Sequence, residues 1–161
     1  MKRSEFNLVI NRASFTTMVT SAIEVYPQEC LGVIFGRKTG HTFVVEYAFA
    51  YQTAKRGKTV VDIDRRIKKR IEEVLQKFIR FKKIGDFHSH TTNTGTRLSS
   101  IDRKDFSGND DIGIVVHVAK RRRKSKCHVK ALTGVMGNFV FDMAAYICHN
   151  SEWQRFNVEL D

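Results

Sequence analysis

The residues best suited to chemistry lie in one stretch, residues 84–105, which reads IGDFHSHTTNTGTRLSSIDRKD. Residues 84–87 predict a short apolar strand, and alternate side chains of a strand point to the same face. We therefore expect His88 and His90 to face one way, as two imidazoles that can bind a borderline-soft cation such as zinc. Asp102, after a polar loop, is placed to supply a third ligand. Such a set leaves one tetrahedral position open, which is typical of catalytic zinc sites.

A structural interpretation of the same residues exists, and the H-x-H pattern alone favours it. The histidines could be satisfied residues at a strand end, and Asp102 could cap a short helix. The spacing of Ser99 and Asp102 shifts the balance toward the metal site. Asp86 and Asp105 flank the motif, and either could orient a ligand imidazole or lie at the surface. One of the other histidines could be the third ligand in place of Asp102, although they lack a metal-like spacing with one another. They are His41, His117, His128 and His149.

The arrangement resembles the JAMM motif of the JAB1/MPN/Mov34 metalloprotease family, H-x-H-x7-S-x2-D with a distant upstream glutamate. In this chain the motif residues are His88, His90, Ser99 and Asp102. The upstream glutamate has a match in Glu29, within YPQECLGVIFG, where it precedes a cysteine, an apolar run and a glycine. The resemblance covers most of the chain in element order, and it is specific because the polar residues recur in order and context.

Two departures from the motif lie in the loop between His90 and Ser99. The family usually has one proline after the second histidine and another before the serine, and these positions here hold Thr91 and Leu98. The loop is also one residue longer than the common spacing. Neither change falls on a ligand, so the departures concern the rigidity of the loop more than the metal.

The resemblance implies a zinc ion bound by His88, His90 and Asp102, and zinc can lower the pKa of a bound water to about 7. A base is then needed within hydrogen-bond reach. Glu29 is the candidate, taking the proton of the water and delivering it to the leaving amine. Without the family pattern, Glu29 would be interpreted as a solvated loop residue. Ser99 could donate a hydrogen bond to the developing oxyanion, or it could cap the helix before Asp102.

The function implied is that of a zinc metalloprotease acting on a peptide or isopeptide bond. Family members of this type cleave the linkage after the C-terminal tail of ubiquitin or of a ubiquitin-like protein. The prokaryotic members, which this short chain is similar to, often pair with ubiquitin-like or sulfur-carrier proteins. Two alternatives stay open. One is a non-catalytic scaffold with the same fold, and the other is a basic nucleic-acid-binding domain with a structural zinc.

Length and composition set the class of protein. With 161 residues and 42% hydrophobic content, the chain is expected to form a single domain, residues 1–161, with a real core. No run approaches a transmembrane helix, and the N-terminus lacks the apolar core of a signal peptide. We therefore expect a cytoplasmic protein with no membrane partner. The cysteines Cys30, Cys127 and Cys148 lie far apart, which predicts reduced thiols and neither disulfides nor a cysteine zinc site.

The charge favours acidic partners. Lys and Arg number 28 against 17 Asp and Glu, giving +11, and such a field attracts anionic surfaces. The segment 120–126, KRRRKSK, is either a solvated hairpin turn or a contact for an acidic protein. No aromatic residues are interleaved with it, which disfavours nucleic acid as the partner.

The predicted elements run β-α-β-β-α-β, then the site, then α-β-β. This order predicts an α/β sandwich with a mixed sheet and helices on its faces, in agreement with the cytidine-deaminase-like MPN fold that the resemblance implies. Ser14 and Asp64 are the expected caps of the first two helices, and residues 144–149 of the tail could form another helix. The expected strands are 6–10, 30–35, 43–51, 84–87, 112–119, 127–132 and 139–143, and the helix after the site is 101–106.

The helix that follows Asp64 is amphipathic. Lys and Arg occupy its other faces, and we expect its apolar stripe to belong to the core and not to a cofactor site. The stripe consists of Ile67, Ile71, Val74, Leu75, Phe78 and Phe81.

Overall fold

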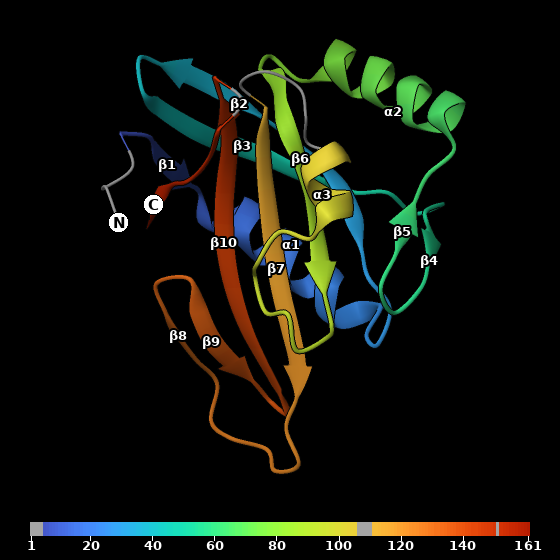
Figure 1. The fold of residues 1–161 in the computed structure, drawn as a ribbon, viewed down its shortest axis with the longest axis vertical. Helices are drawn as coiled ribbons and strands as arrows, with labels where there is room; N and C mark the ends of the chain where they lie inside the picture. The colour runs from blue at the N-terminus through green and yellow to red at the C-terminus, as the bar shows by residue number, and fades with distance from the viewer. Residues whose placement is uncertain (1–4, 106–110, 151) are drawn as a thin grey trace.

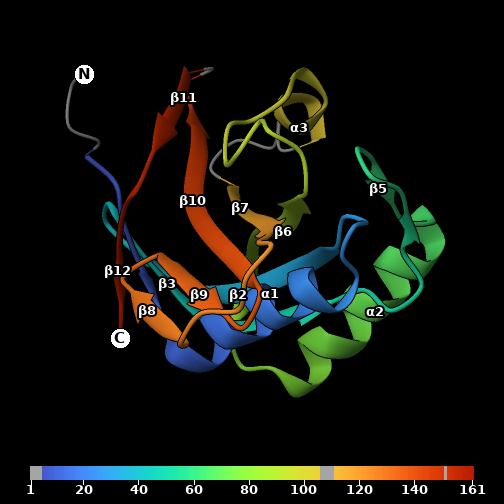
Figure 2. The same ribbon diagram turned by 90° about the horizontal axis from the view of Figure 1, so that it is seen from below.

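The fold is built on one large mixed β-sheet that curls on itself (Figures 1 and 2). The computed structural model describes residues 5–105, 111–150 and 152–161. The strands of this sheet are β1 (Asn7–Ile10), β2 (Leu31–Thr39), β3 (Thr42–Ala50), β6 (Lys82–His90), β7 (Ile112–Lys120), β8 (His128–Lys130), β9 (Thr133–Met136), β10 (Phe139–His149), β11 (Glu152–Arg155) and β12 (Asn157–Leu160). Within the described residues their order is β12-β1-β3-β2-β6-β7-β10-β9-β8, and β11 pairs with β10.

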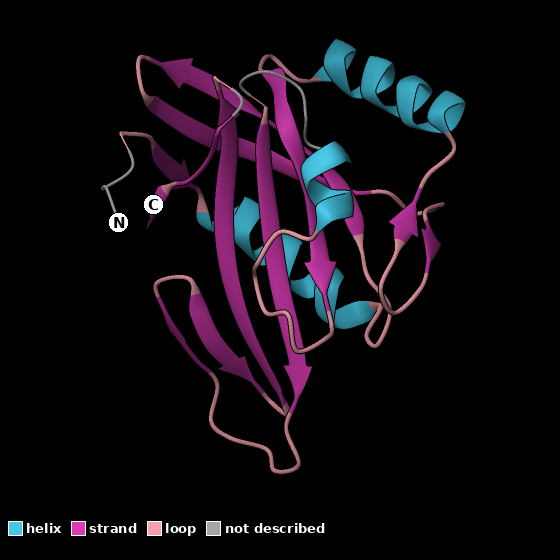
Figure 3. Ribbon diagram, viewed as in Figure 1, coloured by secondary structure: helices cyan, strands magenta, loops and turns pink. Residues whose placement is uncertain are grey.

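The sheet combines both strand directions. β6 runs parallel to β7, and β1 runs parallel to both β3 and β12. The pairs β2–β3, β2–β6, β7–β10 and β8–β9 are antiparallel. A separate antiparallel hairpin is formed by β4 (Lys55–Arg56) and β5 (Val61–Asp62), where the sequence predicted only a basic loop. The predicted α/β class with a mixed sheet is confirmed (Figure 3).

Helices lie on both faces of the sheet. Figure 2 shows α1 (Arg12–Glu24) on one side of β6 and β7, and α3 (Ser100–Asp105) on the other side. The main hydrophobic core lies on the α1 side, where Met18 and Val19 of the helix pack with Phe87, Ile114 and Val116 of the strands. The side of α3 carries the polar loop after β6. The predicted helix at 101–106 is thus present, although Phe106 lies outside the described residues.

The predicted cap of α1 is wrong by one turn. Asn11 is the N-cap, and its Oδ1 accepts a hydrogen bond from the Ser14 backbone N–H over 2.8 Å. Its Nδ2 also donates to the carbonyl of Glu46 on β3 over 2.7 Å. Asn11 therefore ties the start of the helix to the sheet, while Ser14 is buried inside the first turn. For α2 (Arg65–Phe78) the prediction is confirmed, because Asp64 accepts from the N–H groups of Arg66 and Ile67.

The predicted burial of the stripe is confirmed for only half of its six residues, of which three pack against a second hydrophobic cluster and three are exposed. None of the residues of α2, all of which are described, is buried. Ile67 and Leu75 are partly buried against a small second cluster under the helix. Phe78 is 85% exposed and Val74 is 47% exposed. Hydrophobic periodicity identifies residues that share a face, but it does not show how much of that face another element covers.

Polar contacts hold α2 to the sheet in place of a wide apolar interface. Lys68 pairs with Asp86 of β6 over 3.1 Å, and Lys83 of β6 pairs with Glu72 over 2.9 Å. The hydroxyl of Tyr51 donates to the same Glu72 carboxylate over 2.7 Å. Asp86 is therefore engaged by lysines and does not orient a ligand histidine. The side chain of Asp105, the other flanking aspartate, lies outside the described residues.

The C-terminal third differs from the prediction in its strand partners. β10 covers residues 139–149, so the suggested helix at 144–149 is wrong. β10 is also the strand that returns along β7, with Phe139 opposite Lys120 and Ile147 opposite Ile112. The predicted strand at 127–132 is only the short β8, which pairs with β9. In the described part of the chain, no helix is long and apolar enough to cross a membrane.

Candidate metal centre and active site

The site is built at the C-terminal end of β6. Strand alternation places His88 and His90 on the α3 face and sends Phe87 and Ser89 to the other side. Phe87 joins the main core, and both histidines are buried. β7 lies beside this segment in parallel register, with His90 opposite His117. The predicted common face of the histidine pair agrees with this arrangement.

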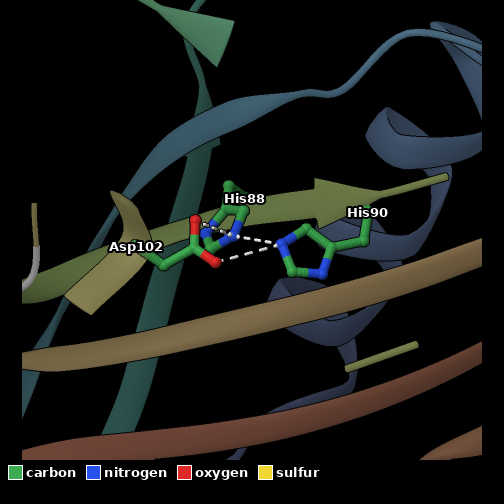
Figure 4. A group of neighbouring side chains, drawn as sticks. All are labelled: His88, His90 and Asp102. Carbon is green, nitrogen blue, oxygen red and sulfur yellow. Dashed lines mark hydrogen bonds and ion pairs between the residues drawn. The ribbon is translucent and has the colours of Figure 1, made fainter. Parts of the chain in front are cut away.

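The two histidines and Asp102 converge on one point (Figure 4). The Nε2 atoms of His88 and His90 lie 2.9 Å apart. Asp102 Oδ1 lies 3.1 Å from His88 Nε2, and Asp102 Oδ2 lies 3.3 Å from His90 Nε2. Among the described residues, this trio is the group of His, Cys, Asp and Glu side chains close enough to share a metal ion. His117 and the other histidines are not part of it, so Asp102 is the third member that the sequence suggested.

The donor atoms fit a bound cation. His90 Nδ1 lies 2.9 Å from the carbonyl oxygen of Gly95, and because a carbonyl only accepts, Nδ1 carries the hydrogen. In the neutral ring, Nε2 then presents its lone pair to the cluster. A backbone carbonyl holding the second nitrogen of a ligand histidine is the arrangement that fixes imidazole tautomers at metal sites. Two imidazole nitrogens and a carboxylate are also a ligand set that zinc accepts.

The charges of the trio are coupled. Burial alone raises the pKa of Asp102, but its interactions with His88 and His90 outweigh burial and hold that pKa well below its usual range. Burial lowers the pKa of His90, whereas Asp102 and the Gly95 carbonyl raise it, with a net upward shift. The aspartate is thus an anion at every physiological pH. It favours a positive charge at the imidazoles, which a proton or a metal ion can supply.

Asp102 is oriented by the start of α3. The backbone N–H of Ser99 donates to Asp102 Oδ2 over 2.6 Å, and the backbone N–H of Asp102 donates to Ser99 Oγ over 3.1 Å. This is the reciprocal pattern of a capping box. The capping alternative for Ser99 is therefore realised. Ser99 also lines the same pocket as the trio, which leaves its predicted oxyanion role a prediction.

Glu29 lies in the pocket of the trio and is not a solvated loop residue. Its side chain is 5% exposed, and it precedes β2, which pairs with β6 so that Leu31 is opposite His88. Burial raises the pKa of Glu29 to about 7, with His90 lowering it and Asp102 raising it. A carboxyl with a pKa near neutrality can both take and return a proton. The adjacent Cys30 thiol has a pKa raised to about 11, mainly by burial, and so stays protonated.

An open pocket of about 460 Å³ connects these groups. One wall is the β4–β5 hairpin, through Val60 and Val61, and another is α3, through Ile101. Val60 and Ile101 are both more than half exposed. Sequence reasoning missed this hairpin wall. The sequence signal for the hairpin was weak, because its two strands are very short and the residues around Gly57 are basic, which is typical of a loop.

The sequence of residues 11–129 matches the family described as prokaryotic homologs of the JAB domain. The chain belongs to this family. Its fold is similar to the solution structure of protein DSY2949 from Desulfitobacterium hafniense, with a TM-score of 0.69, 16% identity, and coverage of 96% of this chain and 92% of that chain. At this identity the likeness concerns the fold alone. No curated protein matches the chain.

The loop in which this JAB domain departs from the JAMM pattern is held by hydrogen bonds. Gly95 has φ +61°, a left-handed conformation that suits glycine, and its carbonyl reaches His90. The Tyr146 hydroxyl donates to the carbonyl of Thr96 over 3.0 Å, and Thr96 is buried. The Thr91 hydroxyl donates to the carbonyl of Pro27 over 3.0 Å. The longer loop without the two prolines is therefore fixed at several points along its length.

Proposed function

We propose that this JAB domain is a zinc-dependent peptidase or isopeptidase that hydrolyses the bond after the C-terminal tail of a ubiquitin-like protein. The observation that carries the proposal is one pocket that holds both the ligand trio and a buried glutamate. His88, His90 and Asp102 could supply three metal ligands, and burial raises the pKa of Glu29 to about 7 in the metal-free protein. Membership of the JAB family supports the same reaction class.

The division of labour follows from the positions of the side chains. His88, His90 and Asp102 would bind a zinc ion, which supplies Lewis-acid activation of a water and of the scissile carbonyl. Glu29 accepts a proton from the attacking water and passes it to the nitrogen of the leaving amine. Ser99, which lines the same pocket, would donate its hydroxyl hydrogen to the oxyanion that develops on the carbonyl.

The shape of the pocket supports an extended peptide tail as the substrate. The pocket is open and runs between the β4–β5 hairpin and α3, with apolar Val60 and Ile101 on its walls. The histidines at its base are buried, so a carbonyl must approach them closely. Small residues next to the scissile bond permit that approach, and a tail ending in Gly-Gly meets this demand. An extended chain can also pair with strand edges such as that of the hairpin.

A fusion of a ubiquitin-like protein to a reporter amine through its Gly-Gly tail tests the proposal. We expect chelator-sensitive cleavage after the second glycine. Glu29→Gln should retain zinc and fold but lose turnover by roughly 10²–10⁴-fold, the usual contribution of acid–base catalysis. Glu73→Gln, an exposed glutamate of α2, is the matched control and should cleave normally.

The outcome of this assay also decides between the enzyme and a scaffold. Thr91 and Leu98 stand where the JAMM motif usually has prolines, which is the observation that keeps a non-catalytic MPN module as the second candidate. The scaffold is the better interpretation if the zinc-loaded protein binds a fusion stoichiometrically but cleaves none of the ubiquitin-like or sulfur-carrier fusions tested. Equal turnover by Glu29→Gln would remove the assigned base.

A further inference from the structure

Ser89, between His88 and His90, faces away from the ligand trio and contacts the segment that carries Glu29. It is completely buried. Its Oγ accepts a hydrogen bond from the Cys30 backbone N–H over 2.8 Å, and its backbone N–H donates to the Cys30 carbonyl over 3.0 Å. The residue that follows Glu29 is therefore bonded to β6 through both of its backbone polar groups. One of these two bonds depends on a side chain.

Thr91, on the other side of His90, contacts the residues that precede Glu29. Its Oγ1 lies 3.0 Å from the Pro27 carbonyl oxygen and 3.2 Å from the Lys58 carbonyl oxygen. The backbone N–H of Glu29 donates to the carbonyl of Gly57 over 2.8 Å. The segment before β2 and the tip of the β4–β5 hairpin are thus joined to each other and to the end of β6. A proline at position 91 would lack the hydroxyl that makes this connection.

We propose that Ser89 and Thr91 are positioning residues that hold the 27–30 segment and thereby place the Glu29 carboxylate beside the ligand trio. This inference rests on the proposed function for its catalytic consequence, but the hydrogen bonds themselves do not. Neither side chain lines the pocket. Their effect on turnover therefore passes through Glu29.

The hydrogen bonds act on Glu29 through the position of its backbone. Glu29 is buried, so its backbone position limits where the carboxylate can lie. Removal of the Ser89 hydroxyl leaves the Cys30 N–H without its buried acceptor, which favours a shift of the segment toward another partner. A misplacement of about 1 Å can reduce a catalysed rate by about 100-fold. Ser89 and Thr91 lie on either side of His90 in the sequence. Their hydroxyls therefore link the segment of Glu29 to the end of β6 that holds the two histidines.

Two variants at position 91 test the proposal most directly. Thr91→Val removes the hydroxyl at nearly constant volume, and Thr91→Ser keeps it. Ser89→Ala removes the other hydroxyl. We expect Thr91→Val and Ser89→Ala to bind zinc like the wild type and to lose about 10–100-fold in kcat with little change in KM. Thr91→Ser should recover the turnover. In a Glu29→Gln background, Thr91→Val should cause no further loss, because residues that act through one group are not additive.

A change in KM with constant kcat, or a full additional loss in the Glu29→Gln background, would overturn the positioning role. Amide hydrogen exchange provides a readout that needs no substrate. Exchange at Glu29 and Cys30 should accelerate in Thr91→Val and Ser89→Ala, whereas Val115 on β7 should not change. If the wild type cleaves no fusion, the proposed function fails. Unchanged exchange at Glu29 and Cys30 overturns the positioning role of Ser89 and Thr91. If Ser89→Ala does not fold, the Thr91 pair decides alone.

Discussion

Ser99 and Asp102 form a reciprocal pair in which each backbone N–H donates to the side chain of the other, over 2.6 and 3.1 Å. The Asp102 carboxylate therefore makes two kinds of contact. It faces the histidines, and it also accepts the hydrogen bond from the Ser99 backbone N–H at the start of α3. Ser99 Oγ accepts the Asp102 N–H through a lone pair. Its hydroxyl hydrogen is not consumed by that bond, so capping and donation to a substrate oxyanion are compatible.

Ser99→Ala should therefore have two separable effects. Loss of the cap should lower the free energy of unfolding by about 1 kcal/mol. Loss of the hydroxyl donor should reduce kcat by roughly 10²–10³-fold, as for other oxyanion donors. Chemical denaturation and turnover of the Gly-Gly fusion measure the two effects, with Ser99→Thr as the variant that keeps both. A destabilised Ser99→Ala protein with full turnover would leave Ser99 only as a cap.

Zinc stoichiometry tests the ligand trio directly. We expect one zinc per chain, and His90→Ala or Asp102→Ala should weaken zinc binding by more than about 100-fold. This loss exceeds the usual effect of removing a residue that only hydrogen-bonds to a metal ligand. His117→Ala is the matched control, since His117 lies opposite His90 on β7 but outside the trio. Metal analysis after dialysis gives the result. Full zinc content in His90→Ala, or loss in His117→Ala, would contradict the assignment.

The common face of His88 and His90 could be predicted from the sequence because side chains alternate strictly along a strand. Asp102 was added through its spacing from Ser99 and the resemblance to the JAMM motif, and its role as a metal ligand stays a prediction. Burial of Glu29 could not be derived in this way, because it depends on β2 pairing with β6 and on the hairpin around Gly57. Both are contacts between distant segments. The hydroxyl contacts of Thr91 likewise arise only when three segments meet.

Stability variants on α2 test the correction to its predicted burial. Leu75 is partly buried against the second cluster, whereas Phe78 is 85% exposed. Leu75→Ala should lower the free energy of unfolding by about 1–2 kcal/mol, below the 2–5 kcal/mol typical of fully buried leucines. Phe78→Ala should change it by less than about 0.5 kcal/mol, as for most surface positions. Urea denaturation compares them, and a larger loss for Phe78→Ala would show that its face is covered.

The pH dependence of the metal-free protein should follow from two raised pKa values. The pKa of His90 is higher in the folded protein than its ordinary value of 6.5, so protonation of His90 stabilises the fold. This stabilisation is complete below pH 6.5 and is lost as the pH rises through the pKa of the folded state. Glu29, raised from 4.5 to about 7, has the same sign, because its charged form is disfavoured when buried. Stability should therefore fall between about pH 5 and pH 8, with a total change of a few kcal/mol at most.

Thermal denaturation at several pH values measures this, with Glu29→Gln as the comparison. The variant should lose less stability than the wild type between pH 5 and pH 8. Added zinc should reverse the trend, because its ligand imidazoles must be deprotonated and its stabilisation therefore grows with pH. A metal-free wild type that becomes more stable toward pH 8 would contradict the assigned signs.

The basic segment 120–126 should strengthen capture of an acidic ubiquitin-like substrate. It is mostly exposed, and it begins at Lys120, three residues beyond His117, which is in register with His90. At about 3.3 Å per residue, the segment starts about 10 Å along β7 from the level of the site. Its backbone is anchored, since the N–H of Arg121 donates to Asn138 and that of Ser125 donates to Gly137. The backbone of the segment is therefore held about 10 Å along the sheet from the level of the site.

Replacement of Arg121, Arg122 and Arg123 with Ala in the Glu29→Gln background should weaken binding of an acidic fusion by about tenfold at low salt. The difference should shrink at 0.5 M salt, because exposed charges are screened beyond about 10 Å already at 0.1 M. The matched control replaces Arg66, Lys69 and Arg70 of α2, which removes the same number of charges elsewhere. Binding measured by calorimetry at both salt concentrations distinguishes the two. Equal losses in both triple variants would assign the effect to net charge, and wild-type binding that ignores ionic strength would remove the basic segment from substrate capture.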